Sequence, residues 1–201
     1  MTTLNYIKLV SSLSLLSVFS HLSAAYAQTK LKVTSDFQNG GNLPAVYTCD
    51  GYNSSPALQW SGVPPETRSF ALIMEDPTIT GALWINWIVY NIPGSWRGIP
   101  KNYLRGKILG YPNHGFNSWG GDTYGGPCPR SGRHRYVLRL FALDYEINQS
   151  SILDRTGLLN IFKDKPPIAE AKIEGFFSRK PGLYESLPIM KKQGMLQGEE
   201  E

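Results

Sequence analysis

The sequence of 201 residues has few of the side chains on which metal sites and nucleophilic enzymes depend. It contains two cysteines and three histidines, and these do not show the spacings that bring metal ligands together. It also lacks the nucleophile elbow G-x-S-x-G, the metalloprotease motif H-E-x-x-H and a Walker-type phosphate loop. We therefore expect a binding protein rather than an enzyme, with no catalytic residues, no metal and no cofactor.

Long runs of positive charge are absent as well. The 20 Lys and Arg residues exceed the 16 Asp and Glu residues, which gives a formal net charge of +4 at pH 7. The basic residues form no block or stripe of the kind that nucleic-acid-binding proteins carry. The mild excess predicts an anionic small ligand or an anionic surface, and no nucleic acid partner.

The single long apolar run lies at the N-terminus. Lys8 precedes an apolar and serine-rich stretch at 9–23 that is too short to span a bilayer, and residues 25–27 are the Ala-Tyr-Ala that a signal peptidase prefers. We expect a signal peptide at 1–27, with an uncleaved N-terminal anchor as the alternative. Its removal takes away one lysine and no acid, which lowers the formal charge from +4 to +3. The mature chain is expected to be exported, periplasmic or secreted, without a transmembrane segment.

The two cysteines, Cys49 and Cys128, both lie in the expected mature chain. In an oxidising compartment an even pair of cysteines more often forms a disulfide than stays free. A metal site is the weaker alternative, because the cysteines are far apart and no histidine has ligand spacing to them. We expect a Cys49–Cys128 disulfide that ties the Gly/Pro-rich segment around Cys128 to an early turn.

Short apolar, β-branched and aromatic runs separated by Pro and Gly predict a mostly β domain. The expected strands are 31–35, 44–49, 57–62, 69–76, 83–92, 135–145 and 168–177. Residues 94–132 form a long Gly/Pro-rich region with weak periodicity, and loops of this length in compact domains are commonly functional. The chain from Ser178 is expected to be a flexible C-terminal extension at 178–201.

One segment late in the chain has helical character. Ser151 and Asp154 form an S-x-x-D start signal. Leu158, Leu159 and Phe162 follow at a spacing that places them on one apolar face. We expect a single helix that begins at this signal and packs against the sheet.

Polar side chains lie within or at the ends of the apolar strands. Strand alternation places His134 and Tyr136 on one face. Asn86 lies in a run that is apolar on both faces, so its amide needs a hydrogen-bond partner. Each polar group also has a structural explanation: Asp76 could open a turn before Pro77, Asn86 could bond a nearby backbone group, and His134 could be a satisfied structural histidine.

Three segments carry a family resemblance. They are PAVYTCDGYNSSPALQWSGVP at 44–64, SFALIMEDP to WINWIVYNIP at 69–93, and YGGPCPRSGRHRYVLRLFALD at 124–144. Together they resemble the phosphatidylethanolamine-binding protein family, in its bacterial Raf-kinase-inhibitor-like branch, over about 33–177. The resemblance implies a large antiparallel sheet packed on a smaller sheet, with a few peripheral helices, in a domain at 28–177.

The resemblance also implies a shallow anion site near one end of the central sheet. Matched by motif, the expected ligand-binding residues are Asp76, Trp84, Asn86, Gly126, Pro127, Pro129, His134 and Tyr136. Gly and Pro would hold the loop so that its backbone donors approach an anion closely. His134 would offer a ring donor and Tyr136 a hydroxyl. The alternative is that the segment Gly-Gly-Pro-Cys-Pro is only a disulfide corner.

The chain departs from the family pattern at two points. Asn86 stands where the family has a strand histidine, and Thr78 and Thr80 stand where it has a second acid and a second proline. An asparagine can donate a hydrogen bond to a phosphate oxygen, but it cannot carry charge, and charge-assisted bonds are about twice as strong as neutral ones. We expect weaker anion binding, with at most one proton taken up between pH 7 and 5.5.

These observations predict an exported binding protein for a phosphorylated or otherwise anionic small group, such as a phospholipid headgroup. The alternative function is that of a protein inhibitor or modulator of a kinase or protease. A hydrolase that uses His134 and Asp76 as an acid–base pair ranks last, since both groups would have to reach the same substrate atom.

Overall fold

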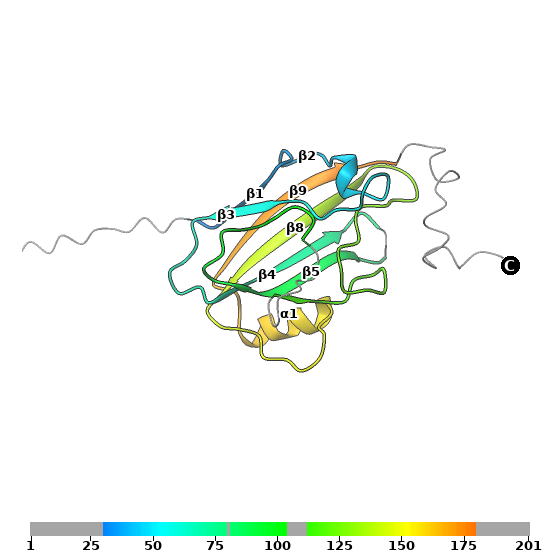
Figure 1. Cartoon of the computed structure of the whole chain (residues 1–201). Helices are drawn as coiled ribbons and strands as arrows, with labels where there is room; N and C mark the ends of the chain where they lie inside the picture. The colour runs from blue at the N-terminus through cyan, green and yellow to red at the C-terminus, as the bar shows by residue number, and fades with distance from the viewer. Residues whose placement is uncertain (1–29, 80, 104–111, 180–201) are drawn as a thin grey trace, which may run out of the picture.

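The computed structural model describes residues 30–79, 81–103 and 112–179 (Figure 1). Within these residues the elements are β1 (Lys32–Ser35), β2 (Gly41–Asn42), the 3-10 turn η1 (Ala45–Tyr47), β3 (Leu58–Ser61), β4 (Ser69–Asp76), β5 (Trp84–Pro93), β6 (Gly98–Ile99), β7 (Asn113–His114), β8 (His134–Leu143), α1 (Arg155–Asp164) and β9 (Ala169–Phe177). The expected signal peptide at 1–27 and the extension beyond residue 179 lie outside the described residues.

The strands form two sheets, and α1 makes a third layer. The small sheet has the order β1-β3-β6, and the large sheet has the order β2-β9-β8-β4-β5-β7. All neighbours are antiparallel except the two-residue edge pair of β2 with β9, which is parallel. In Figure 1 the small sheet and α1 lie on opposite sides of the large sheet. The expected fold, a large sheet packed on a smaller one, is confirmed.

The central strands β4 and β5 of the large sheet are buried on both faces, which explains their continuous apolar runs. Every residue of β4 is buried. Phe70, Leu72 and Met74 pack toward the small sheet, in one core cluster with Leu58 and Trp60. The intervening Ala71 and Ile73 pack in a second cluster with Leu158 and Phe162 of α1. A strand between two apolar layers needs apolar side chains at every position.

Six of the seven expected strands are confirmed, and the strand expected at 44–49 is wrong. Ala45–Tyr47 forms η1 instead. Pro44 has no amide hydrogen to offer a neighbouring strand. The chain then turns back on itself, with the Thr48 N–H and hydroxyl both donating to the Ala45 carbonyl at 3.0 and 2.9 Å. Local turn bonds therefore override the strand propensity of Val46 and Tyr47.

The helix is confirmed, but it begins one turn later than the start signal suggests. Asp154, not Ser151, is the N-cap, and its carboxylate accepts the Gly157 N–H at 2.7 Å. The residue before it, Leu153, is buried and its carbonyl accepts the Phe116 N–H at 2.8 Å. This tie to a distant segment keeps the chain before Asp154 out of the helix.

Candidate functional site

Asp76 and His134 meet where β4 ends and β8 begins, on neighbouring strands. Asp76 Oδ2 lies 2.6 Å from His134 Nδ1, and Asp76 Oδ1 accepts the Thr78 N–H at 2.9 Å. The carboxylate is nearly inaccessible, with 3% of its side chain exposed, against 17% for His134. Because a carboxylate only accepts, Nδ1 carries a proton, and Nε2 is the ring nitrogen left for a ligand.

Tyr136 completes this cluster from the same face of β8. Its ring stacks on His134 with 6.4 Å between centroids, and its hydroxyl hydrogen-bonds the Asp76 carboxylate. Burial is the main cause that raises the pKa of the Tyr136 phenol, and the charge of Asp76 raises it further. The phenol therefore stays protonated and acts as a donor. His134 and Tyr136 therefore lie on the same face of β8, as predicted, and both interact with Asp76.

Thr78, which stands where the resemblance implies a second acid, has a structural partner. Its hydroxyl oxygen accepts the backbone N–H of Arg135 at 2.8 Å. Together with the Asx-type bond from the Thr78 N–H to Asp76, this ties the turn after β4 to the start of β8. Thr78 therefore fixes the two strand ends that carry Asp76 and His134.

Asn86 is fully buried, and its side chain has the structural role that the sequence analysis left open, a hydrogen bond to a backbone group. It is the unopposed residue of a bulge, because Met74 pairs with Trp87 and Glu75 pairs with Ile85. Its Nδ2 donates to the Gly125 carbonyl at 2.7 Å, and its backbone carbonyl accepts the Gly125 N–H at 3.0 Å. Asn86 Oδ1 is buried without a hydrogen-bond partner in the described part of the chain. The amide therefore tethers the Gly/Pro loop.

The loop itself turns its glycine N–H groups inward, which corrects the expected role of its backbone donors. Gly125 N–H donates to Asn86, as described, and Gly126 N–H donates to Asn53 Oδ1 at 2.7 Å. A Cβ at Gly126 would lie 2.4 Å from the Tyr47 carbonyl oxygen. Glycine is needed here for close packing against an early segment of the chain, and its amide is already satisfied within the protein.

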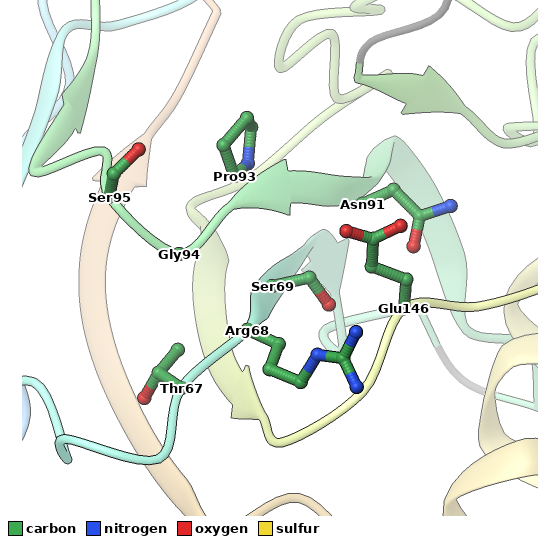
Figure 2. A pocket seen from close by; sticks show the side chains of 8 residues that line it. All are labelled: Thr67, Arg68, Ser69, Asn91, Pro93, Gly94, Ser95 and Glu146. Carbon is green, nitrogen blue, oxygen red and sulfur yellow. The ribbon is translucent and has the colours of Figure 1, made fainter.

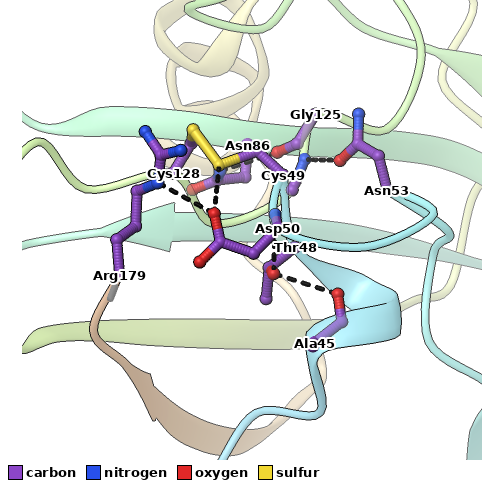
Figure 3. Close-up of a disulfide and its surroundings, with 10 residues drawn as sticks. Ala45, Thr48, Cys49, Asp50, Asn53, Asn86, Gly125, Cys128 and Arg179 are labelled. Atoms are coloured by element: carbon purple, nitrogen blue, oxygen red, sulfur yellow. Dashed lines mark hydrogen bonds and ion pairs between the residues drawn. A yellow bond between two sulfur atoms is a disulfide. The ribbon is translucent and has the colours of Figure 1, made fainter. Parts of the chain in front are cut away.

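That early segment, Tyr47–Asn53, braces the Gly/Pro loop by several links (Figure 3). The Cys49–Cys128 disulfide joins the two segments, and the Cys49 N–H donates to the Pro127 carbonyl at 3.1 Å. Pro127 and Pro129 are buried in this contact. The Tyr124 hydroxyl donates to the Tyr47 carbonyl at 2.7 Å. The expected disulfide is therefore part of a larger brace.

A buried ion pair belongs to the same region. Arg179 Nε lies 2.9 Å from Asp50 Oδ1, and the two side chains are only 6% and 8% exposed. Figure 3 shows this pair beside the disulfide. Sequence reasoning assigned no role to Asp50 or Asn53 and placed Arg179 in the expected flexible extension, whereas its side chain is buried in this ion pair. The Asp-Gly-x-Asn spacing at Asp50–Asn53, within the first resemblance segment, was the available signal.

Trp84 contacts the Gly/Pro loop indirectly, through Trp119, a residue that sequence reasoning did not single out. Trp84 and Trp119 pack edge to face, with 5.1 Å between ring centroids. The Trp119 indole lies over Gly125, where a Cβ would come within 2.0 Å of it. Asn117 Oδ1 fixes the turn by accepting the Trp119 N–H at 2.9 Å. Trp84 thus supports the loop from the start of β5.

Comparison with known proteins identifies the family. The family model "Phosphatidylethanolamine-binding protein" matches residues 33–178. The chain belongs to this family. A UPF0098 protein of Methanothermobacter thermautotrophicus is 38% identical over 147 residues, which cover 73% of this chain and 97% of that protein. The UPF0098 protein YbcL of Escherichia coli is 34% identical over 145 residues, which cover 69% of this chain and 79% of that protein.

Solved structures of this family share the fold. A phosphatidylethanolamine-binding protein homologue from Chlamydia trachomatis has a TM-score of 0.68 and 31% identity, over 76% of this chain and 99% of that one. The E. coli YbcL structure has a TM-score of 0.68 and 32% identity, over 75% and 99%. Among the described residues of the present protein, no helix is long and apolar enough to cross a bilayer, and no group of three or more His, Cys, Asp or Glu residues is placed to hold a metal.

Proposed function

We propose that the chain is an exported protein that binds a phosphate-bearing or other anionic small group where β4 ends and β8 begins. Members of the family are generally binding proteins. The observation that carries the proposal is the Asp76–His134 pair, in which Nδ1 is engaged at 2.6 Å and Nε2 remains. A ring held by a buried carboxylate is pre-organised, so little entropy is lost when Nε2 meets an anion.

This geometry makes anion binding depend on a proton. With Nδ1–H held by Asp76, Nε2 becomes a donor only when the ring is protonated. An anion therefore binds best to the charged imidazole, and its binding should be coupled to the uptake of at most one proton. Asn86 adds no second proton, because an amide does not ionise in this range.

The contacts of Asp76 give little support to the alternative of a hydrolase that uses His134 and Asp76 as an acid–base pair. Both Asp76 oxygens are occupied within the protein, by Thr78 and His134, and the side chain is nearly inaccessible. Asp76 would act through His134 rather than on a substrate atom. It is a positioning residue for the imidazole in the function proposed here.

The test is a titration with dimethyl phosphate, whose single charge is constant between pH 5 and 8, followed by NMR of the amides and of the His134 ring. We expect shifts at Asp76 and His134, with millimolar affinity that strengthens by no more than tenfold per pH unit, the limit for one proton. His134→Gln should abolish the pH dependence, while Lys172→Gln, an exposed charge removal on β9, should leave it intact.

Two results would overturn the proposal. One is the absence of any shift at Asp76 or His134 with tens of millimolar dimethyl phosphate at pH 5.5. The other is binding whose pH dependence is the same in His134→Gln as in the unchanged protein. Steeper strengthening than one proton allows would contradict the role assigned to Asn86.

A further inference from the structure

The strand β9 is paired on one of its two sides over only part of its length. On the first side it pairs with β8 along the whole strand. On the other side it pairs with β2, but only at Gly175 and Phe176, and the turn before β2 extends this contact by one residue, to Glu174. Residues 169–173 therefore form an edge of the large sheet to which no other described strand is bonded.

Glu170 and Lys172 direct their backbone groups toward this edge. Backbone groups alternate in direction along a strand, and those of Glu174 point outward, since its carbonyl accepts the Gly40 N–H at 2.7 Å and its N–H donates to Asn39 Oδ1 at 2.9 Å. Glu170 and Lys172 are an even number of residues from Glu174 in an unbroken register, so their groups point the same way. In the described part of the chain, nothing bonds these N–H and carbonyl groups. Such an edge is a template for another strand.

The two exposed side chains at this edge have opposite charges. Glu170 and Lys172 lie on one face of β9, whereas Ala171 and Ile173 lie on the other face, in the core. The Glu170 carboxylate accepts a hydrogen bond from Arg139 Nε at 2.8 Å, through one of its two oxygens. The Lys172 ammonium group makes no hydrogen bond or ion pair with another described residue. An acid and a base two residues apart can both face the opposite charge when the strand pairs with an antiparallel copy of itself.

We propose that this edge binds a second copy of the chain, with the two β9 strands antiparallel about a two-fold axis at Ala171. Glu170 then lies directly opposite Lys172 of the second copy, and symmetry repeats the pair in reverse. Because both residues point their backbone groups outward, each facing pair exchanges two N–H···O bonds. Opposite charges that face each other across a strand pair stabilise it further.

The charges select this register over the neighbouring ones. If the strands shifted so that Glu170 faced Glu170 of the second copy, or Lys172 faced Lys172, like charges would lie directly opposite each other and destabilise the pair. The pairing cannot continue past Glu174, whose backbone groups are already bonded. Since both copies use the same edge, the association closes at two copies.

A second copy at this edge leaves the other sites of the molecule accessible. His134 pairs with Phe177, six residues along β9 from Ala171, which corresponds to about 20 Å at about 3.4 Å per residue. The 450 Å³ pocket that Arg68 and Ser69 help to line lies at the start of β4, two strands away from β9 (Figure 2). Dimer formation and anion binding should therefore be independent.

The experiment is sedimentation equilibrium of the protein, together with amide NMR at increasing protein concentration. We expect a weak dimer with a Kd of about 0.1–1 mM, because the interface is a short strand pair without an apolar core. The amide shifts that change with concentration should gather at 169–173. Lys172→Glu should weaken the dimer at least tenfold, because both facing pairs become repulsive. Lys163→Glu, the matched charge reversal on α1, should leave the dimer unchanged.

A mixture of two variants makes the test specific to this register. Glu170→Lys alone should also weaken the dimer, since two lysines then face each other in each pair. Mixed with Lys172→Glu, it should form a heterodimer about as strong as the unchanged dimer, because every facing pair again has opposite charges. His134→Gln should leave dimer formation unchanged, so that this proposal and the anion site can fail separately.

Several results would overturn the proposal. A protein that stays monomeric at about 1 mM would leave the edge to a strand of another protein. A dimer of Lys172→Glu as strong as that of the unchanged protein, or concentration-dependent shifts that gather away from 169–173, would place the interface elsewhere. The absence of a heterodimer in the mixture would exclude the register centred at Ala171.

Discussion

Replacing both Cys49 and Cys128 by serine should remove much of the stability of the fold. The two cysteines are 79 residues apart in the sequence, so the bridge closes a long loop in the unfolded chain. Chain-entropy arithmetic for a loop of this length gives about 15 cal/mol/K, or about 4.5 kcal/mol at 25 °C. Single domains are typically stable by about 5–15 kcal/mol. The double variant should therefore fold, but with a small margin.

Anion binding should survive in the molecules that remain folded. The brace keeps three links that do not involve sulfur: Cys49 N–H to the Pro127 carbonyl at 3.1 Å, Gly126 N–H to Asn53 at 2.7 Å, and the Tyr124 hydroxyl to the Tyr47 carbonyl at 2.7 Å. These bonds hold the loop against Tyr47–Asn53 once the chain is folded. Affinity for dimethyl phosphate should therefore change by less than about threefold, equivalent to about 0.7 kcal/mol.

The assay is urea unfolding followed by circular dichroism, with the double variant compared with the oxidised protein at low temperature. The NMR titration is then repeated on the folded variant. Two results would refute the reasoning. A loss of stability below about 1 kcal/mol would mean that the unfolded chain gains little freedom when the bridge is absent. Loss of the His134 shifts in a folded variant would mean that the disulfide, not the hydrogen-bonded brace, positions the site.

Three further predictions concern single residues. Gly126→Ala should cost about 1–3 kcal/mol in urea unfolding, because its Cβ would lie 2.4 Å from the Tyr47 carbonyl oxygen, whereas Gly121→Ala, with open space around its Cβ, should be nearly neutral. Burial raises the pKa of the Tyr136 phenol, so above pH 10 the unfolded chain releases this proton while the folded protein keeps it, and stability falls by up to about 1.4 kcal/mol per pH unit from this group. Between pH 9 and pH 11 the Tyr136→Phe variant should lose less free energy of unfolding than the unchanged protein, as measured by urea unfolding at the two pH values. Asn86→His should make the affinity for dimethyl phosphate, measured by NMR titration, increase more steeply between pH 7 and 5.5. An unchanged pH dependence would mean that the side chain at position 86 does not contact the bound anion.

Most strands were predictable because runs of consecutive apolar residues are a strong local signal. The run at Ser69–Asp76 has five consecutive apolar residues at its centre, and β4 has those same bounds. The segment at 44–49 carried similar β propensity, yet its Pro44 and the turn bonds around Thr48 decide its structure. Propensity fails where a short segment satisfies its backbone groups within itself, since no partner strand is then needed.

The candidate site was predictable only in the part that strand alternation governs. Asp76, His134 and Tyr136 converge because neighbouring strands place them on one face. The loop donors could not be predicted in the same way. Gly126 is satisfied by Asn53, a side chain 73 residues earlier in the sequence, and no local pattern reports such a contact. The residue types were recognisable, whereas their partners depended on the tertiary fold.

Asn86 stands where the resemblance implies a histidine, and this difference affects how strongly the proposed site can attract an anion. The cluster holds one carboxylate, Asp76, and one ionisable ring, His134, so even with the ring protonated its charges sum to zero. The two arginines next to His134 in the sequence are engaged elsewhere, since Arg135 lies 3.3 Å from Glu174 and Arg133 packs over Phe176. Attraction must then come from the directed Nε2–H bond rather than from net charge, and a single charge-assisted bond contributes about 1.5–3 kcal/mol. Binding of an isolated phosphate group should therefore be weak and reversible, and a physiological ligand should gain its remaining affinity from contacts beyond the phosphate.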